Sequence, residues 1–206
     1  MKNSAKTIEL FEFDKGFGVL VGGCDEAGRG PLAGPVVCAA CVMPMDEIID
    51  KINDSKKVSE KVREALYEAI KEKAISYSVS IIDRGEIDEI NILNATKKGM
   101  TEAINGLKVK PNLMLVDAVK LDCDMKTLPL IKGDAKSYNI AAASIIAKVT
   151  RDRIMRDLDE KYPEYGFAAH KGYGTAKHIE ALKTYGATPC HRKTFIKNFI
   201  SEDFGE

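Results

Sequence analysis

The stretch that decides the fold is residues 19–35, VLVGGCDEAGRGPLAGP. Its opening apolar residues predict a strand that rises out of the interior and ends at two adjacent carboxylates, Asp25 and Glu26. A turn of small residues follows. The apolar run over 35–43 then predicts a second strand, and the short connection predicts that the two strands are antiparallel.

The acidic pair indicates a metal site with a nucleotide site beside it. Neighbouring negative charges at the end of a buried strand repel each other and favour a cation close by. Carboxylate oxygens suit the hard divalent ions Mg²⁺ and Mn²⁺. The sequence Gly28-Arg29-Gly30 offers unobstructed backbone N–H groups and one planar cation, which fit a phosphate or a ribose near the metal.

Two other interpretations fit the same stretch. An acidic pair before a glycine is also typical of a solvated hairpin turn. The pattern Gly28-x-Gly30-x-x-Ala33 matches the dinucleotide fingerprint, but that fingerprint requires a helix to begin at the glycines. Here Pro31 and Pro35 interrupt the loop and a β-rich run follows, which argues against a dinucleotide site. No Gly-Lys-Ser/Thr follows, and this excludes a P-loop.

The composition is that of an ordinary globular chain. Its 206 residues suffice for one domain with a small appendage, at 45% apolar and 30% charged content. No apolar stretch approaches the roughly 20 residues of a membrane span, and residues 1–16 lack a signal peptide's apolar core, so we expect a cytoplasmic protein without membrane contact. The odd count of 5 cysteines argues against disulfides. Cys38 and Cys41 have the spacing of a redox pair but would point to opposite faces of a strand.

Charge is unevenly distributed although the net charge is zero. Residues 161–200 contain only two acids, Glu164 and Glu180, and all three histidines. The basic residues of this segment are Lys161, Lys171, Lys177, Lys183, Arg192, Lys193 and Lys197. A basic C-terminal quarter beside an acidic remainder is expected where one part binds phosphates and another holds metals, although a solvated basic face would look the same.

The rest of the chain predicts helices that alternate with strands. After the second strand we expect a helix over 59–74, a strand over 75–82, a helix over 87–107, strands over 113–116 and 128–131, and helices over 139–161 and 176–185. The buried stripe of the helix over 87–107 is expected to contain Leu93, Met100, Ile104 and Leu107. This order predicts an α/β fold with a five-stranded mixed sheet flanked by helices.

Carboxylates end three of the predicted strands. Asp117 follows the apolar run over 113–116, and Asp134 follows the run over 128–131. If these strands are neighbours of the first, both carboxylates converge with the Asp25–Glu26 pair at one edge of the sheet. Two divalent ions roughly 3.5–4 Å apart would then serve in-line attack of water on a phosphodiester. Each strand-end aspartate taken alone is also explained as a turn residue.

Six motifs in order resemble those of bacterial ribonuclease HII, the type 2 ribonuclease H family. They are CDEAGRGPLAGPV, NDSKKVSEKVREALYEAI, ILNATKKGM, LVDAV, KGDAKSYNIAAASIIAKVTRDRIM and YGFAAHKGYGTAKH, and they span residues 21 to about 195. The sequence of residues 1–18 itself indicates a loosely attached leader. The resemblance implies an RNase H-like catalytic domain, here over 19–162, and a helical C-terminal extension, here the basic segment over 163–206. It also implies hydrolysis of the RNA strand of RNA/DNA hybrids and incision 5′ to single ribonucleotides in duplex DNA, leaving 3′-hydroxyl and 5′-phosphate ends.

The same resemblance assigns the site residues. Two Mg²⁺ or Mn²⁺ ions would be held by the catalytic acids Asp25, Glu26, Asp117 and Asp134. The loop Gly28-Arg29-Gly30 would contact the 2′-hydroxyl of the ribonucleotide, and Tyr173 would stack on the next deoxyribose, where the absence of a 2′-hydroxyl distinguishes DNA from RNA. This chain has Cys24 where the family usually has a small aliphatic residue and Ala118 where it often has glycine.

Further residues are expected to contact the substrate or to support the site. Lys56, Lys57 and Lys171 are candidate phosphate contacts, each equally explained as a solvated lysine. The helix over 139–161 is expected to support the site through Ser144, Lys148, Arg151 and Asp152. We expect a monomer that binds hybrids and ribonucleotide-containing DNA duplexes. A sliding clamp contact near Phe199 and Phe204 has no support beyond these two rings in the last residues.

Three rival classes remain distinguishable by experiment. A non-catalytic hybrid-binding module would keep the basic segment without needing four acids. A different two-metal nuclease of the same fold class, such as a resolvase, would keep the acids without the Gly28-Arg29-Gly30 loop and Tyr173, and it would cut branched DNA. A dinucleotide-dependent enzyme would bind a nicotinamide or flavin.

Overall fold

The computed structural model describes residues 4–200, and its core is a five-stranded mixed sheet of order β3-β2-β1-β4-β5. The strands are β1 (Val21–Ala27), β2 (Val36–Val42), β3 (Ser76–Ile82), β4 (Leu113–Asp117) and β5 (Thr127–Leu130). Strand β1 is antiparallel to β2 and parallel to β4, and β4 is parallel to β5. The predicted fold class and the antiparallel first pair are confirmed.

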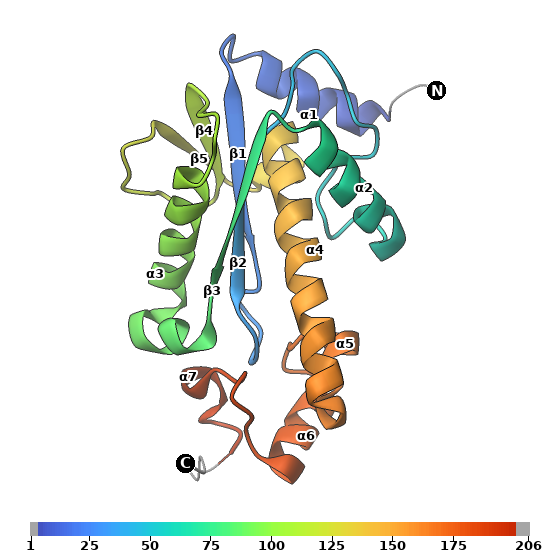
Figure 1. The fold of residues 1–206 in the computed structure, drawn as a ribbon, viewed down its shortest axis with the longest axis vertical. Coiled ribbons are helices and arrows are strands. Elements are labelled where there is room, and N and C mark those ends of the chain that lie inside the picture. The colour runs from blue at the N-terminus through green and yellow to red at the C-terminus, as the bar shows by residue number, and fades with distance from the viewer. Residues whose placement is uncertain (1–3, 201–206) are drawn as a thin grey trace.

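Helices cover both faces of the sheet (Figure 1). They are α1 (Ala5–Lys15), α2 (Glu60–Lys73), α3 (Arg84–Asn105), α4 (Tyr138–Lys161), α5 (Phe167–His170), α6 (Ala176–Tyr185) and α7 (Lys193–Ile196), with short 3-10 turns η1 (Gly133–Ala135) and η2 (Pro163–Tyr165). In Figure 1, α1, α2 and α4 lie on one side of the strands and α3 lies on the other, while α5, α6 and α7 gather at one end. No helix within residues 4–200 is long and apolar enough to cross a membrane.

Strand β2 lies at the centre of both cores because all seven of its side chains are buried. Alternate residues point to opposite faces. Val37, Ala39 and Cys41 therefore pack with α1, α2 and α4, while Cys38 and Ala40 pack with α3. This placement separates Cys38 from Cys41, as expected, and all 5 cysteines are free thiols.

The interpretation of residues 1–18 as a loosely attached segment is wrong for the part that is described. Residues 5–15 form α1, whose Leu10 and Phe11 are buried in the α4 core. The buried Asp14 accepts hydrogen bonds from the Asn139 backbone N–H and side chain, both at 2.8 Å, and from the Ser137 hydroxyl at 3.0 Å. These bonds join α1 to the beginning of α4.

The predicted buried stripe of α3 needs one correction, at Leu93. Met100, Ile104 and Leu107 are buried as expected, but Leu93 is 45% exposed. The reason is a break at Asn91, whose φ of 66° and ψ of 161° are not helical. The Asn91 side chain accepts hydrogen bonds from the next turn, including Leu93 N–H at 3.0 Å, so the helix restarts there in a different phase.

The C-terminal segment has a small core of its own against the loop that follows β1. Leu32, Met155, Phe167, Leu182 and Ile196 belong to this cluster. The loop and the segment are also joined by a β-bridge between Ala33 and His191. The division of the chain into domains stays a prediction.

Candidate active site

The ends of β1 and β4 bring two of the predicted acids together. In the parallel register Cys24 lies opposite Val116, so the next residues, Asp25 within β1 and Asp117 at the end of β4, lie side by side. Asp117 Oδ1 accepts a hydrogen bond from the Gly133 N–H at 2.6 Å, which brings η1 and therefore Asp134 to the same edge. The acidic pair lies inside β1 and does not follow it, because the strand extends to Ala27 and includes both Asp25 and Glu26.

The acids perturb one another's ionisation. Burial raises the pKa of Asp25 well above its usual value, and the charges of Glu26 and Asp117 raise it further. Burial also raises the pKa of Glu26, although the Arg29 guanidinium, with 3.6 Å between its nitrogen and the carboxylate oxygen, partly offsets this. Asp134 shows a raised pKa for the same reason, burial first and then neighbouring carboxylates.

These carboxylates fit hard divalent cations by their chemistry. Glu26 Oε2 is buried and has no hydrogen-bond partner among the described residues, so it is free to bind a cation. In the described part of the chain no three Asp, Glu, His or Cys side chains are already grouped as a metal site. The other three acids lie close enough to Asp25 for their charges to raise its pKa. To bind one metal ion together, the four side chains would have to turn toward it.

A cavity of about 420 Å³ joins the acidic pair to the nucleotide-reading candidates. Its lining consists of Asp25, Glu26, Ala27, Gly28, Arg29, Gly30, Ser55, Lys56, Lys148, Arg151 and Tyr173. Tyr173 is 48% exposed, and a Cβ added to Gly30 would lie 3.7 Å from its ring carbon Cε1. The structure therefore places two segments 143 positions apart in the sequence, at residues 30 and 173, against each other.

Two buried arginines hold the loop between β1 and β2. Arg192 donates to the carbonyls of Gly28 at 2.6 Å, Arg29 at 2.8 Å and Gly34 at 2.9 Å. Arg151 donates to the carbonyls of Ala33 at 3.1 Å, Pro35 at 3.0 Å and Lys171 at 2.9 Å.

The sequence predicted a supporting role for Arg151, whereas Arg192 counted only as one of several basic residues. Nothing in the local sequence distinguishes a buried arginine from a solvated one. The glycine at position 28 is required by this packing, because its φ is 99° and a Cβ there would lie 2.0 Å from Arg151 Nε.

The three predicted lysine contacts separate in the structure. Lys56 lines the cavity; burial lowers its pKa, but the charges of Asp134, Asp54 and Asp25 outweigh this and raise it above the ordinary value. Lys57 lines a different cavity with Ser59. Lys171 donates its ammonium to the Ala168 carbonyl at 2.6 Å. The sequence analysis did not identify Asp54, whose charge also raises the pKa of Asp134. The one sequence signal for Asp54 is its position in the motif NDSKK.

Helix α4 supports the cavity through an ionic network. Asp152 accepts a hydrogen bond from Lys148 at 2.6 Å and lies 3.7 Å from the Arg63 guanidinium on α2. Lys148 lines the cavity, and burial lowers its pKa although the Asp152 charge opposes the change. Ser144 donates to the Ala141 carbonyl within its own helix and contacts no site residue through that bond. Ala118, where the family often has glycine, has a φ of 49°.

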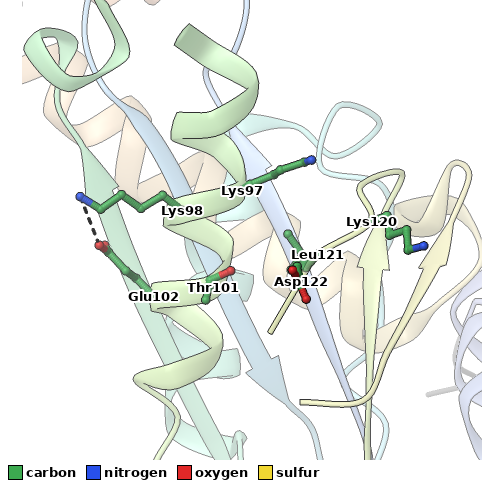
Figure 2. A pocket seen from close by; sticks show the side chains of 7 residues that line it. All are labelled: Lys97, Lys98, Thr101, Glu102, Lys120, Leu121 and Asp122. Atoms are coloured by element: carbon green, nitrogen blue, oxygen red, sulfur yellow. Dashed lines mark ion pairs between the residues drawn. The ribbon is translucent and has the colours of Figure 1, made fainter. Parts of the chain in front are cut away.

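A larger cavity of about 650 Å³ lies away from these residues, between α3 and the segment after β4. Figure 2 shows Lys97 extending from α3 toward the segment that carries Lys120, Leu121 and Asp122, and Lys98 paired with Glu102. None of the predicted site residues lines it. Its lining carries both positive and negative side chains and therefore indicates no particular class of ligand.

The fold is that of the ribonuclease H class. The structure of ribonuclease H2 from Pyrococcus horikoshii OT3 superposes with a TM-score of 0.74 and 31% identity, over 87% of this chain and 96% of that one. The RNase HII in the PCNA:RNase HII complex from Archaeoglobus fulgidus gives a TM-score of 0.72 at 28% identity, over 90% and 98% of the two chains. RNases HIII share the fold at 16% identity, with a TM-score of 0.61 for Bst-RNase HIII in complex with Mn²⁺.

The ribonuclease HII family profile matches residues 22–198, and the chain belongs to that family. Ribonuclease HII of Ruminiclostridium cellulolyticum is 60% identical over 195 residues, which are 94% of this chain and 76% of the relative. Ribonuclease HII of Acetivibrio thermocellus is 59% identical over 182 residues, 88% of this chain and 71% of the relative. The chain is accordingly a ribonuclease H, of a family that hydrolyses the RNA strand of RNA/DNA hybrids.

Proposed function

We propose that this enzyme also incises duplex DNA on the 5′ side of a single embedded ribonucleotide and leaves 3′-hydroxyl and 5′-phosphate ends. The observation that carries the proposal is the shared cavity, in which the acidic pair, the Gly28-Arg29-Gly30 loop and Tyr173 line one space. A nuclease that only needed to cut a uniform hybrid would not require a sugar-stacking ring beside a 2′-hydroxyl reader.

The acids Asp25, Glu26, Asp117 and Asp134 would hold two divalent cations. Bound Mg²⁺ or Mn²⁺ would lower the pKa of the attacking water and neutralise charge on the departing 3′ oxygen. The raised pKa of Asp25 and the unpartnered Glu26 oxygen support this assignment, since burial and neighbouring carboxylates disfavour the charged form of Asp25 and a bound cation would favour it.

The remaining residues would bind and orient the substrate. Arg29 and the backbone N–H groups of the glycines on either side would contact the 2′-hydroxyl and the adjacent phosphate. Tyr173, with half of its surface free, would stack on the sugar that follows. Lys56 would contact a phosphate beside the acids without reading sequence, whereas the positions of Lys57 and Lys171 give such a role no support.

Cleavage of a DNA duplex that carries one ribonucleotide tests the proposal. We expect a nick 5′ to the ribonucleotide with Mg²⁺ or Mn²⁺, no nick with EDTA, no nick in the all-DNA duplex, and loss of the nick in Asp134→Asn. Cleavage of long hybrids only would refute the incision and the roles of Arg29 and Tyr173. Cleavage of the all-DNA duplex would favour the rival nuclease of the same fold class.

Partners beyond nucleic acid are not proposed. The monomeric state stays a prediction. A clamp contact would involve Phe204, which lies outside the described residues, and the PCNA complex concerns the Archaeoglobus protein.

A further inference from the structure

The three histidines of the chain lie together behind Tyr173. His178 and His191 are buried, with their Nε2 atoms 3.0 Å apart. His170 stacks on His178 with ring centroids 4.6 Å apart and an interplanar angle of 15°. None of the four proposed catalytic acids belongs to this cluster, and the proposed reaction does not involve it.

Hydrogen-bond chemistry fixes where each proton of the buried pair lies. The Thr188 N–H can only donate, so His191 Nδ1, at 2.9 Å, must accept. The neutral His191 ring then carries its proton on Nε2 and donates to His178 Nε2. His178 carries its own proton on Nδ1 and donates it to the Tyr173 carbonyl at 2.9 Å. The result is a directed relay that ends on the backbone of Tyr173.

His170 holds the preceding peptide by the same logic. The Gly172 N–H donates to His170 Nδ1 at 3.2 Å, and His170 Nε2 donates to the Tyr165 carbonyl at 2.7 Å. The backbone just before Tyr173 and the carbonyl of Tyr173 itself are therefore both bonded to imidazoles. This segment needs such support because Lys171, with a φ of 51°, has a left-handed backbone that its side chain disfavours.

An aromatic enclosure keeps the relay neutral. Phe167 lies edge-on to His178 with centroids 5.4 Å apart, and Tyr165 lies 5.1 Å from His191. Burial lowers the pKa of His178, and burial together with the neighbouring His178 lowers the pKa of His191 to about 4. A second proton on either ring would place two N–H groups against each other and break the relay.

We propose that His178 is a positioning residue for substrate selection: its Nδ1–H bond fixes the peptide of Tyr173 so that the phenol ring stands against Gly30 at the cavity wall. The inference rests on the proposed function, in which Tyr173 stacks on the sugar after the ribonucleotide. A Cβ added to Gly30 would lie 3.7 Å from the ring carbon Cε1, so the ring faces the glycine across the width of one carbon atom, and a shift of about 1 Å in the Tyr173 backbone would change that spacing.

The test measures selectivity rather than activity. The ratio of kcat/KM for a DNA duplex with one ribonucleotide to kcat/KM for a continuous RNA/DNA hybrid compares a deoxyribose with a ribose at the Tyr173 position. The active enzyme concentration cancels from this ratio, so partial unfolding lowers both values and leaves it unchanged. Circular dichroism confirms that each variant is folded.

Three variants report on the relay. We expect Tyr173→Ala to lower the ratio about tenfold, and His178→Leu to lower it by the same factor because the Tyr173 carbonyl loses its donor. His178→Asn, whose amide nitrogen takes the place of Nδ1, should restore most of the ratio. The double variant His178→Leu/Tyr173→Ala should show no further loss, because both changes remove one interaction.

The outcomes separate this inference from the proposed function. If Tyr173→Ala leaves the ratio unchanged, the role of Tyr173 in the proposed function fails. If Tyr173→Ala lowers the ratio and His178→Leu does not, only the positioning role of His178 is overturned.

Should His178→Leu fail to fold, the pair His191→Gln and His191→Leu gives the same decision. The glutamine amide can donate to His178 Nε2 and leucine cannot, so a lowered ratio in the leucine variant alone supports the relay. Equal ratios in both variants refute it.

Discussion

Replacing Arg192 by lysine should disconnect the loop between β1 and β2 from the C-terminal segment. The guanidinium is fully buried and donates to three carbonyls, those of Gly28, Arg29 and Gly34. An ammonium group is a point donor on a flexible stem and would satisfy one of these oxygens, so two bonds to a charged donor are lost. At about 1.5–3 kcal/mol for each such bond, the loss is about 3–6 kcal/mol. This is a large part of the roughly 5–15 kcal/mol that holds a typical domain folded.

Urea unfolding of wild type and Arg192→Lys measures this difference directly. Arg153→Lys is the matched control on α4, because Arg153 pairs with Glu64 and Glu68 at the surface and its loss should cost less than about 1 kcal/mol. We also expect Arg192→Lys to bind substrate less tightly, since the loop that carries Arg29 is no longer fixed. A stability change no larger than that of Arg153→Lys would refute the reasoning.

Four further outcomes are expected. Between pH 6.5 and 4, wild type should lose about 3 kcal/mol of unfolding free energy that His191→Gln retains. The His191 pKa of about 4 in the folded state lies below its ordinary value, so the unfolded chain takes up the proton first as the pH falls. Parallel pH profiles of the two proteins in urea would contradict this. Gly28→Ala, with its Cβ against Arg151, should abolish cleavage and lower the melting temperature; an unchanged melting temperature would show that the loop repacks. In EDTA, Asp25→Asn should have a higher melting temperature than wild type, because it removes a buried carboxyl from beside other acids. Mg²⁺ should raise the melting temperature of wild type only, and no increase would mean that the acids bind no metal. Ala118→Gly should gain about 1 kcal/mol in urea by relieving a φ of 49°, and no gain would mean that this backbone is unstrained.

The five strands and the four longer helices after residue 59 could be predicted in their order along the chain because they depend on local patterns, whereas α1, α5 and α7 were not predicted. The helix over 176–185 agrees with α6 residue for residue, and β2 needed only its continuous apolar run. The exceptions are caused by contacts distant in sequence. Asp14 looks like one of several exposed acids of the first 18 residues, and only Asn139, 125 positions later, makes it a buried acceptor.

The site shows the same division between local and distant causes. That Asp25 and Asp117 lie close together could be predicted from the apolar runs before them, and the two residues do lie side by side on adjacent parallel strands, although β1 continues past Asp25 to Ala27. The lysines could not be sorted, because Lys56 and Lys57 are neighbours in sequence and a turn directs them to different cavities. The burial of Arg192 likewise depends on carbonyls from a loop formed by the first strands.

The bonds from Arg192 to the loop after β1 also bear on how the enzyme is made. Residues 28 and 192 are 164 positions apart, so the loop leaves the ribosome long before the side chain that fixes it. A nascent chain that has reached α4 already contains all four acids, but the loop that carries Arg29 has no buried Arg192 guanidinium to hold its carbonyls. If the loop selects the substrate as proposed, fragments that stop before residue 192 should keep the four acids and lose substrate selection.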